Sequence, residues 1–133
     1  MSVIDASVVA HLLLDLPLAR AAEEHVLSAR EPAQAPDLLN VEVLHVLRRH
    51  EQRGLITEAR SREALDDLLI LPIAHYPTSA LVDAAWSLRR NFTAYDAMYL
   101  ALAEALGTSL VTADGPLAAA ARARSAVKVV LLA

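Results

Sequence analysis

The sequence predicts an α/β fold of three layers, in which helices cover both faces of a parallel sheet. Short apolar runs, several rich in β-branched residues, alternate along the 133 residues with longer segments of helical periodicity. That alternation is typical of strand–helix–strand units and of a parallel sheet buried on both faces. The composition agrees with it. Hydrophobic residues make up 56% of the chain and aromatic residues only 4%, as expected when helices rich in Ala, Leu and Val pack on a small sheet.

The predicted strands are brief apolar runs next to turn-forming residues. We expect them at residues 3–4, around Gln34 within residues 32–36, and at residues 71–76, 109–112 and 127–131. The second is expected to be very short, because Pro32 and Pro36 flank it. Five strands in 133 residues leave room for a helix in every connection.

The predicted helices carry apolar residues at helical spacing, and most follow a residue that can cap them. We expect them at residues 8–14, 18–29, 37–53, 57–69, 78–90, 95–106 and 117–124. Thr78 or Ser79 is the expected cap of the fifth, while Gly54 and Gly107 are expected to end the third and the sixth. Residues 113–116 are expected to end the fourth strand before the last helix.

The composition also limits where the protein works. Its length suits a single domain, residues 1–133. No uncharged run reaches the roughly 18 residues that span a bilayer, and the start of the chain lacks the pattern of a secretory signal. Cysteine is absent, which excludes disulfides and thiolate metal sites and fits a reducing compartment. We therefore expect a cytoplasmic protein without membrane contact.

The charges argue against a generally basic surface for nucleic acid, because the formal net charge is −4. Eleven residues are Arg and Lys128 is the lone Lys. Several Arg are neighbours, such as Arg48 with Arg49 and Arg89 with Arg90. A solvated helix face explains each pair most simply. Contact with phosphate, for which the planar guanidinium is well shaped, is the functional alternative, and no single Arg is favoured.

Four acidic residues occupy places where a parallel sheet would gather them. Asp5 and Asp114 directly follow the first and fourth predicted strands, and ligands of open α/β sheets bind beyond the carboxyl ends of the strands. Asp96 begins a helix three residues after Thr93, the spacing of a capping box. Glu42 lies among apolar residues, where a charge needs a partner.

Each acid also has an ordinary structural interpretation, which is favoured when it is considered alone. Asp5 and Asp96 can cap helices, and Asp114 can be a turn residue. Glu42 can lie on the exposed side of its helix. Together, however, the four carboxylates would repel one another unless a cation neutralised them. Mg²⁺ or Mn²⁺ suits such oxygen ligands and can activate a water for phosphodiester cleavage.

Four stretches of the sequence are similar to the motifs of one known family. They are VIDAS at residues 3–7, NVEVLHVLRR at 40–49, TAYDAMYLALAEALG at 93–107 and LVTADGPLA at 110–118. They resemble the PIN domain, and most closely the VapC-type toxins of bacterial toxin–antitoxin pairs. The resemblance covers essentially the whole chain in the family's order. The last two motifs are rather specific, whereas the first would be weak alone.

The resemblance implies a metal-dependent endoribonuclease that uses Mg²⁺ or Mn²⁺. The family's four acids, which are its catalytic and metal-binding residues, fall on Asp5, Glu42, Asp96 and Asp114. Ser7 and Thr112 match positions where the family often has a hydroxyl beside the metal site. After the fourth acid the family often has basic or polar residues, but this sequence has Gly115 and Pro116. That departure bears on contacts with RNA more than on the chemistry.

The resemblance also implies an architecture and partners. The family's sheet has the order 3-2-1-4-5 with helices on both sides. The substrate implied is RNA, such as a structured RNA of the tRNA kind. The protein is further expected to form a homodimer and to bind a cognate VapB-type antitoxin that covers the groove.

Three other functions compete with this interpretation. Glu42 and His45 have the Glu-x-x-His spacing of di-iron bundles, but no second such pair exists. His45 is therefore expected to neighbour the site or to be a packed polar residue. A phospho-accepting receiver domain would need an acid near Tyr76, which the sequence lacks. The third alternative is a non-catalytic PIN-fold module that binds nucleic acid or protein.

Trp86 and Tyr99 are expected in the core or in dimer contacts.

Overall fold

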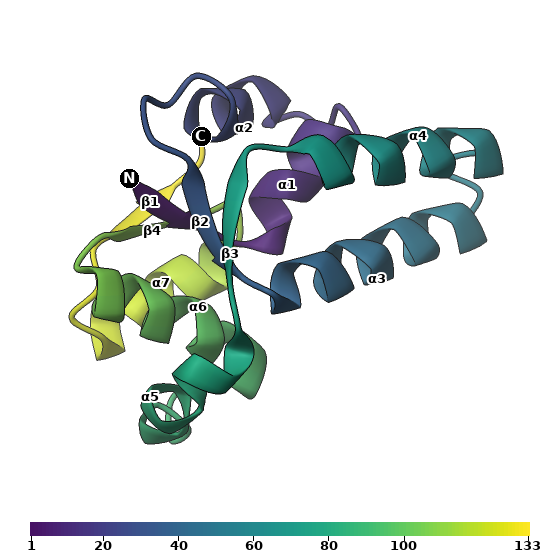
Figure 1. The fold of residues 1–133 in the computed structure, drawn as a ribbon. Coiled ribbons are helices and arrows are strands. Elements are labelled where there is room, and N and C mark those ends of the chain that lie inside the picture. The colour runs from purple at the N-terminus through teal and green to yellow at the C-terminus, as the bar shows by residue number, and fades with distance from the viewer.

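All residues, 1–133, are described by a computed structural model, in which a five-stranded parallel sheet forms the centre of the protein (Figure 1). The strands are β1 (Ser2–Ile4), β2 (Ala33–Pro36), β3 (Ile73–Tyr76), β4 (Ser109–Thr112) and β5 (Val129–Leu131). Their order is β3-β2-β1-β4-β5, and every neighbouring pair is parallel. Both the predicted fold class and the predicted strand order are confirmed.

The first strand is the central one, although it is only three residues long. Val3 lies opposite Gln34 of β2 on one side and Leu110 of β4 on the other. Val3, Ile4 and Leu110 are completely buried, because helices cover both faces of the sheet. Strands buried on both faces are uniformly apolar rather than alternating, which is why these short runs are recognisable in the sequence.

The helices fill the connections between the strands. They are α1 (Ala6–Leu13), α2 (Ala19–Val26), α3 (Leu38–Gln52), α4 (Glu58–Ile70), the 3₁₀ turn η1 (Thr78–Leu81), α5 (Val82–Ser87), α6 (Ala94–Leu106) and α7 (Gly115–Arg124). In Figure 1, α1, α3 and α4 lie on one side of the sheet, and α5, α6 and α7 lie on the other. Right-handed crossovers on either side of β1 require this division. The apolar helix α6 packs on β1, β2 and β4.

The region between β3 and α6 differs from the prediction. In place of one helix over residues 78–90, η1 is followed by the six-residue helix α5, and neither Thr78 nor Ser79 caps it. Two side chains at the end of α5 bond to backbone carbonyls of the helix. The Ser87 hydroxyl donates to the carbonyl of Ala84 at 2.6 Å, and Arg89 donates to the carbonyl of Trp86 at 3.1 Å. Such bonds compete with continuation of a helix.

Trp86 is not in the core, one of the two places expected for it: its side chain is 67% exposed, with the Arg89 guanidinium 4.7 Å from the ring centre. Farther along the chain, the fourth strand ends at Thr112 as predicted, but Gly115 and Pro116 already form the first turn of α7, which begins two residues earlier than expected. Proline suits this position, because the first backbone N–H groups of a helix have no partner within it.

No helix in the structure combines the length and the apolar character that a membrane span requires.

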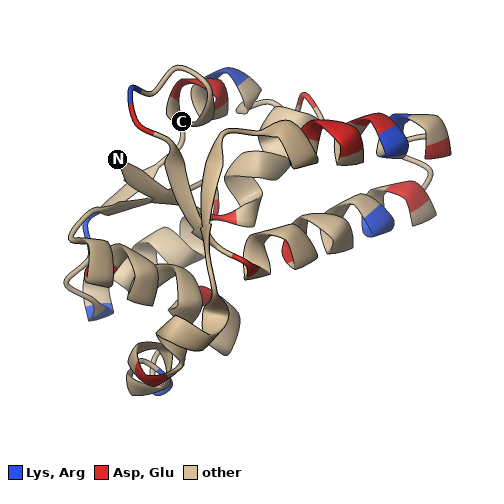
Figure 2. Cartoon of the chain, viewed as in Figure 1, with Lys and Arg blue, Asp and Glu red and all other residues tan.

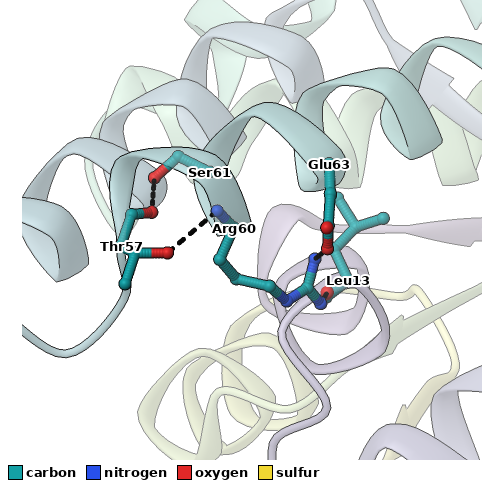
Figure 3. Close-up of polar contacts among 5 residues, drawn as sticks. All are labelled: Leu13, Thr57, Arg60, Ser61 and Glu63. Atoms are coloured by element: carbon teal, nitrogen blue, oxygen red, sulfur yellow. Dashed lines mark hydrogen bonds and ion pairs between the residues drawn. The ribbon is translucent and has the colours of Figure 1, made fainter.

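The helix pair α3–α4 extends away from the sheet (Figure 1), and buried apolar residues of both helices belong to the hydrophobic core. Two polar contacts add to this packing. Arg60 donates a hydrogen bond to the backbone carbonyl of Leu13 at the end of α1 (Figure 3), and its guanidinium lies 3.7 Å from the carboxylate of Glu63. The Ser61 hydroxyl donates to Glu51 of α3 at 2.7 Å. Polar groups therefore supplement apolar packing in holding α4 against α1 and α3.

We predict that Arg60→Met lowers the free energy of unfolding by about 1–2 kcal/mol, because the carbonyl of Leu13 loses its donor. Urea denaturation followed by circular dichroism measures this change. Arg62→Met is the matched control. Arg62 pairs only with the exposed Asp66 on its own helix, so its removal should change stability by less than about 0.5 kcal/mol. Equal effects of the two substitutions would contradict the role of Arg60.

Candidate active site

The structure brings the four predicted acids together in one cavity of about 550 Å³ at the carboxyl edge of the sheet. Asp5, Glu42, Asp96 and Asp114 all line it. Asp5 follows β1, and Asp114 follows β4 two residues after Thr112. Glu42 lies in the second turn of α3, and Asp96 in the first turn of α6. Acidic segments at the starts of α3 and α6 are visible in Figure 2.

Asp5 is the most firmly held of these acids. It is buried, with 6% of its surface exposed, and it is the N-cap of α1. Its Oδ1 accepts hydrogen bonds from the backbone N–H of Ser7 and Val8, at 3.1 and 3.3 Å, and from the Ser7 hydroxyl at 2.5 Å. Its Oδ2 accepts from the Thr112 hydroxyl at 2.5 Å. The carboxylate is thus fixed in one orientation at the cavity wall.

Ser7 and Thr112 connect the ends of two strands through Asp5. The Ser7 hydroxyl oxygen accepts from the backbone N–H of Ala113 at 2.9 Å, and Thr112 Oγ1 accepts from that of Asp114 at 3.0 Å. Thr112 is completely buried. Both predicted hydroxyl residues therefore lie beside Asp5, and they join the turn after β1 to the turn after β4.

Asp114 caps α7, since its Oδ1 accepts from the backbone N–H of Leu117 at 3.0 Å. The cap explains why α7 begins at Gly115, earlier than predicted. Asp5 thus has the capping role that the sequence allowed, whereas Asp114 caps a helix instead of serving as the expected turn residue, and both also line the cavity. The structural and functional interpretations of these two acids are compatible.

Asp96 does not cap its own helix. Thr93 does so, accepting a hydrogen bond at Oγ1 from the backbone N–H of Asp96 at 3.2 Å. The half-buried Asp96 carboxylate accepts no hydrogen bond and forms no ion pair in the chain. Only one half of the predicted capping box is formed, which leaves this carboxylate free toward the cavity.

Glu42 is free in the same way. Its Oε1 is buried without a hydrogen-bond partner, and so is the hydroxyl of Tyr99, a residue that is only 2% exposed. Burial raises the pKa of Glu42, and the nearby Tyr99 hydroxyl opposes this rise only in part; the two groups do not form a hydrogen bond of regular geometry. Tyr99 is part of the core, as expected, but its hydroxyl also borders the cavity.

The cavity disfavours negative charge on three of the acids. Burial is the main cause that raises the pKa of Asp5, of Glu42 and of Asp96, and repulsion between neighbouring carboxylates adds to it. Hydrogen bonds from Ser7 and Thr112 partly oppose the rise in the pKa of Asp5. A cation in the cavity would reverse both effects, because it would compensate for lost hydration and cancel the repulsion.

The donor set suits a hard divalent cation. Its ligands would all be carboxylate oxygens, and Glu42 Oε1 is a buried oxygen that lacks a partner. The side chains are not arranged as a closed cage, because no three Asp, Glu or His residues have the spacing of a metal site. Water in the coordination sphere, which Mg²⁺ usually retains, is compatible with such an open arrangement.

The rim of the cavity contains one residue that the sequence did not single out, Tyr95 of α6. His45 and Arg49 of α3 line it as well. His45 is a neighbour of the site, one of the two alternatives expected for it. Among the Arg residues only Arg49 lines the cavity. Tyr95 could have been suspected from its place beside Asp96, but nothing in the sequence indicates that its side chain is exposed.

Comparisons with known proteins agree with this architecture. The sequence model of the PIN domain matches residues 2–123. The VapC ribonuclease Mb0985 of Mycobacterium bovis is 39% identical over 130 residues, which is 98% of each chain.

Two solved structures show the same fold. VapC20 of Mycobacterium tuberculosis, described as a sarcin-ricin loop cleaving toxin, aligns with a TM-score of 0.66 at 17% identity over 90% of this chain and 95% of the other. A chain of a toxin–antitoxin complex from Klebsiella pneumoniae aligns with a TM-score of 0.61 at 20% identity, over 86% and 87%. From the family match and the near full-length relative, this chain belongs to the PIN domain family and is of the VapC type.

Proposed function

We propose that this protein is an endoribonuclease that hydrolyses RNA phosphodiester bonds with the help of Mg²⁺ or Mn²⁺, as the toxin of a VapBC-type pair. One observation carries the proposal: four carboxylates from separate elements line a single cavity, and none is paired with a Lys or Arg of the chain. The relative of near full length that is named a VapC ribonuclease supports the same activity.

The residues of the cavity would have different roles in metal binding and catalysis. Asp5, Asp96 and Asp114 would hold the ion, directly or through water, and Glu42 would complete the site and orient the attacking water. Ser7 and Thr112 hold Asp5 in place. The bound ion would supply an activated water and would stabilise the negative charge that develops on the phosphate. Free carboxylates at Glu42 and Asp96 are compatible with these roles, because no bond within the chain must be broken.

The partners follow from the same assignment. An antitoxin of the VapB type is the proposed protein partner, supported by the VapC name of the relative and by the fold shared with a chain of a toxin–antitoxin complex. Assembly as a homodimer, action on a structured RNA such as tRNA and a cytoplasmic location remain predictions.

Asp96→Asn should abolish RNA cleavage while leaving the fold intact. The substitution keeps the shape of the side chain but removes its charge from the metal cradle, so the rate should fall by about 100-fold or more. Cleavage of total RNA with added Mg²⁺ or Mn²⁺, mapped by end sequencing, measures this. EDTA should have the same effect on the unmodified protein.

Asp37→Asn is the matched control for that experiment. Asp37 is also an acid at the start of a helix, but it is exposed, it does not line the cavity and its side chain makes no cap bond. The Asp37→Asn protein should therefore cleave RNA at the same rate as the unmodified protein. Full activity of Asp96→Asn, or activity that persists in EDTA, would refute the proposal. If the unmodified protein binds Mn²⁺ but cleaves no RNA with or without it, the result would favour a non-catalytic binding module.

Asp96→Asn should also raise the melting temperature of the metal-free protein at neutral pH, by roughly 1–3 °C. Because the pKa of Asp96 is raised in the folded state, folding opposes its ionisation, and this destabilisation disappears as the pH falls below that raised pKa. The difference between the two proteins should therefore narrow on acidification. Mn²⁺ should stabilise the unmodified protein more than the variant. Thermal melts from pH 5 to 8 in EDTA or Mn²⁺ test this.

A further inference from the structure

We propose that Arg49 and Tyr95 form a nucleotide-binding subsite at the rim of the carboxylate cavity. Tyr95 stacks on an unpaired base, and Arg49 binds a phosphate adjacent to the one that is cleaved. The inference rests on the proposed function in taking RNA as the ligand. It adds to that function a location for the flanking nucleotide and a preference for single-stranded RNA.

Arg49 is the only Lys or Arg among the residues that line the cavity. It forms no ion pair and no side-chain hydrogen bond with the chain, although four carboxylates line the same cavity. A guanidinium that stays unpaired near carboxylates keeps all its donors available for another anion. Its planar fork fits the oxygens of a phosphate.

The position of Arg49 on α3 separates it from the acids by enough to contact a phosphate other than the one that is cleaved. Glu42, His45 and Arg49 lie on one stripe of the helix, and Arg49 is two turns, about 10 Å, from Glu42 along the axis. Helical side chains lean toward the N-terminus, so Arg49 extends over the turn that contains His45. In Figure 2 the outer half of α3 contains a basic segment followed by an acidic one. Within the cavity, Arg49 thus supplies a positive charge on the part of α3 away from Glu42.

Tyr95 supplies the second component from the opposite helix. It precedes Asp96 in the first turn of α6, and its side chain is 60% exposed despite its place at the cavity. Its hydroxyl makes no hydrogen bond within the chain. An exposed ring beside a phosphate-binding group is a stacking platform, and stacking of bases on aromatic side chains is typical of proteins that bind single strands.

The arrangement favours an unpaired nucleotide over a base pair. In a duplex both faces of a base are covered by its neighbours, so a side chain such as Tyr95 can stack only on a base that has left the helix. The other arginines are less suitable for this cavity. Arg89 is stacked on Trp86 on α5, Arg60 is bonded to Leu13, and Arg48 does not line the cavity.

Binding of a fluorescein-labelled single-stranded RNA, measured by anisotropy over a range of salt concentrations, tests the inference. The full-length Asp96→Asn protein is used with Mg²⁺, so that binding is read without cleavage. Adding Tyr95→Ala should weaken binding about tenfold, and Tyr95→Phe should restore it, because the ring is retained. Adding Arg49→Gln should weaken binding to a similar extent and reduce the salt slope by about 0.7, the value for one phosphate contact on a single strand.

Two substitutions outside the cavity are the controls. Arg48→Gln removes the same charge from the adjacent position, and Trp86→Ala removes an exposed aromatic ring from α5. Both should keep the affinity within about twofold and the salt slope unchanged. If Arg48→Gln reduces binding and its slope as much as Arg49→Gln, charge alone is responsible and the subsite is wrong. An effect of Trp86→Ala equal to that of Tyr95→Ala would overturn the placement of the base.

A duplex of the same sequence separates single-strand recognition from general attraction. The unmodified subsite should prefer the single strand, and Tyr95→Ala should reduce that preference. Equal affinity for both forms would overturn the inference. The result does not depend on cleavage, so a protein that binds RNA through Arg49 and Tyr95 but does not cut it would refute the proposed function alone. If cleavage occurs but neither substitution changes RNA affinity, the proposed function stands and the subsite is refuted.

Discussion

The carboxylate of Asp5 accepts hydrogen bonds from two backbone N–H groups and two hydroxyls, at the point where the central strand becomes a helix. Through Ser7 and Thr112 these bonds join the end of β1 to the end of β4, and through Asp114 they reach the start of α7. The cavity edge is therefore one connected hydrogen-bonded unit. Two of the four acids owe their direction to it, and a shift in either strand would misplace both.

The four acids fall into two pairs that behave differently. Asp5 and Asp114 cap helices, so the backbone determines where they point. Glu42 and Asp96 project from helices that need no contribution from their side chains, and burial without a partner makes their negative charge unfavourable. One wall of the cavity is thus rigid and the other adjustable. If the cavity binds a cation as proposed, Asp5 and Asp114 would offer it fixed ligands, and the unbonded carboxylates of Glu42 and Asp96 would be free to complete its environment.

Most of the fold could be predicted from the sequence, because the strands are short apolar runs and Gly54 and Gly107 end their helices at positive φ. The helix expected over residues 78–90 is interrupted, and Ser87 and Arg89 bond to backbone carbonyls there, contacts that local propensity does not reveal. The four acids could be grouped because strand ends in a parallel sheet share an edge. The sequence offered Arg49 as one of several candidates for phosphate contact but could not place Arg49 or Tyr95 at the cavity, because side-chain direction on opposing helices depends on how those helices pack.

The double role of Asp5 also affects how a protein of this kind can change by mutation. Replacing Asp5 removes a helix cap and a link between two strands, so the fold suffers together with any activity. Replacing Glu42 or Asp96 removes a partly buried charge that lacks a partner, so the free energy of unfolding should rise. A lineage released from selection for activity would therefore lose Glu42 or Asp96 first and keep Asp5 longest. Retention of Asp5 alone in a relative is consequently weak grounds for inferring an active enzyme, whereas retention of Asp96 is strong.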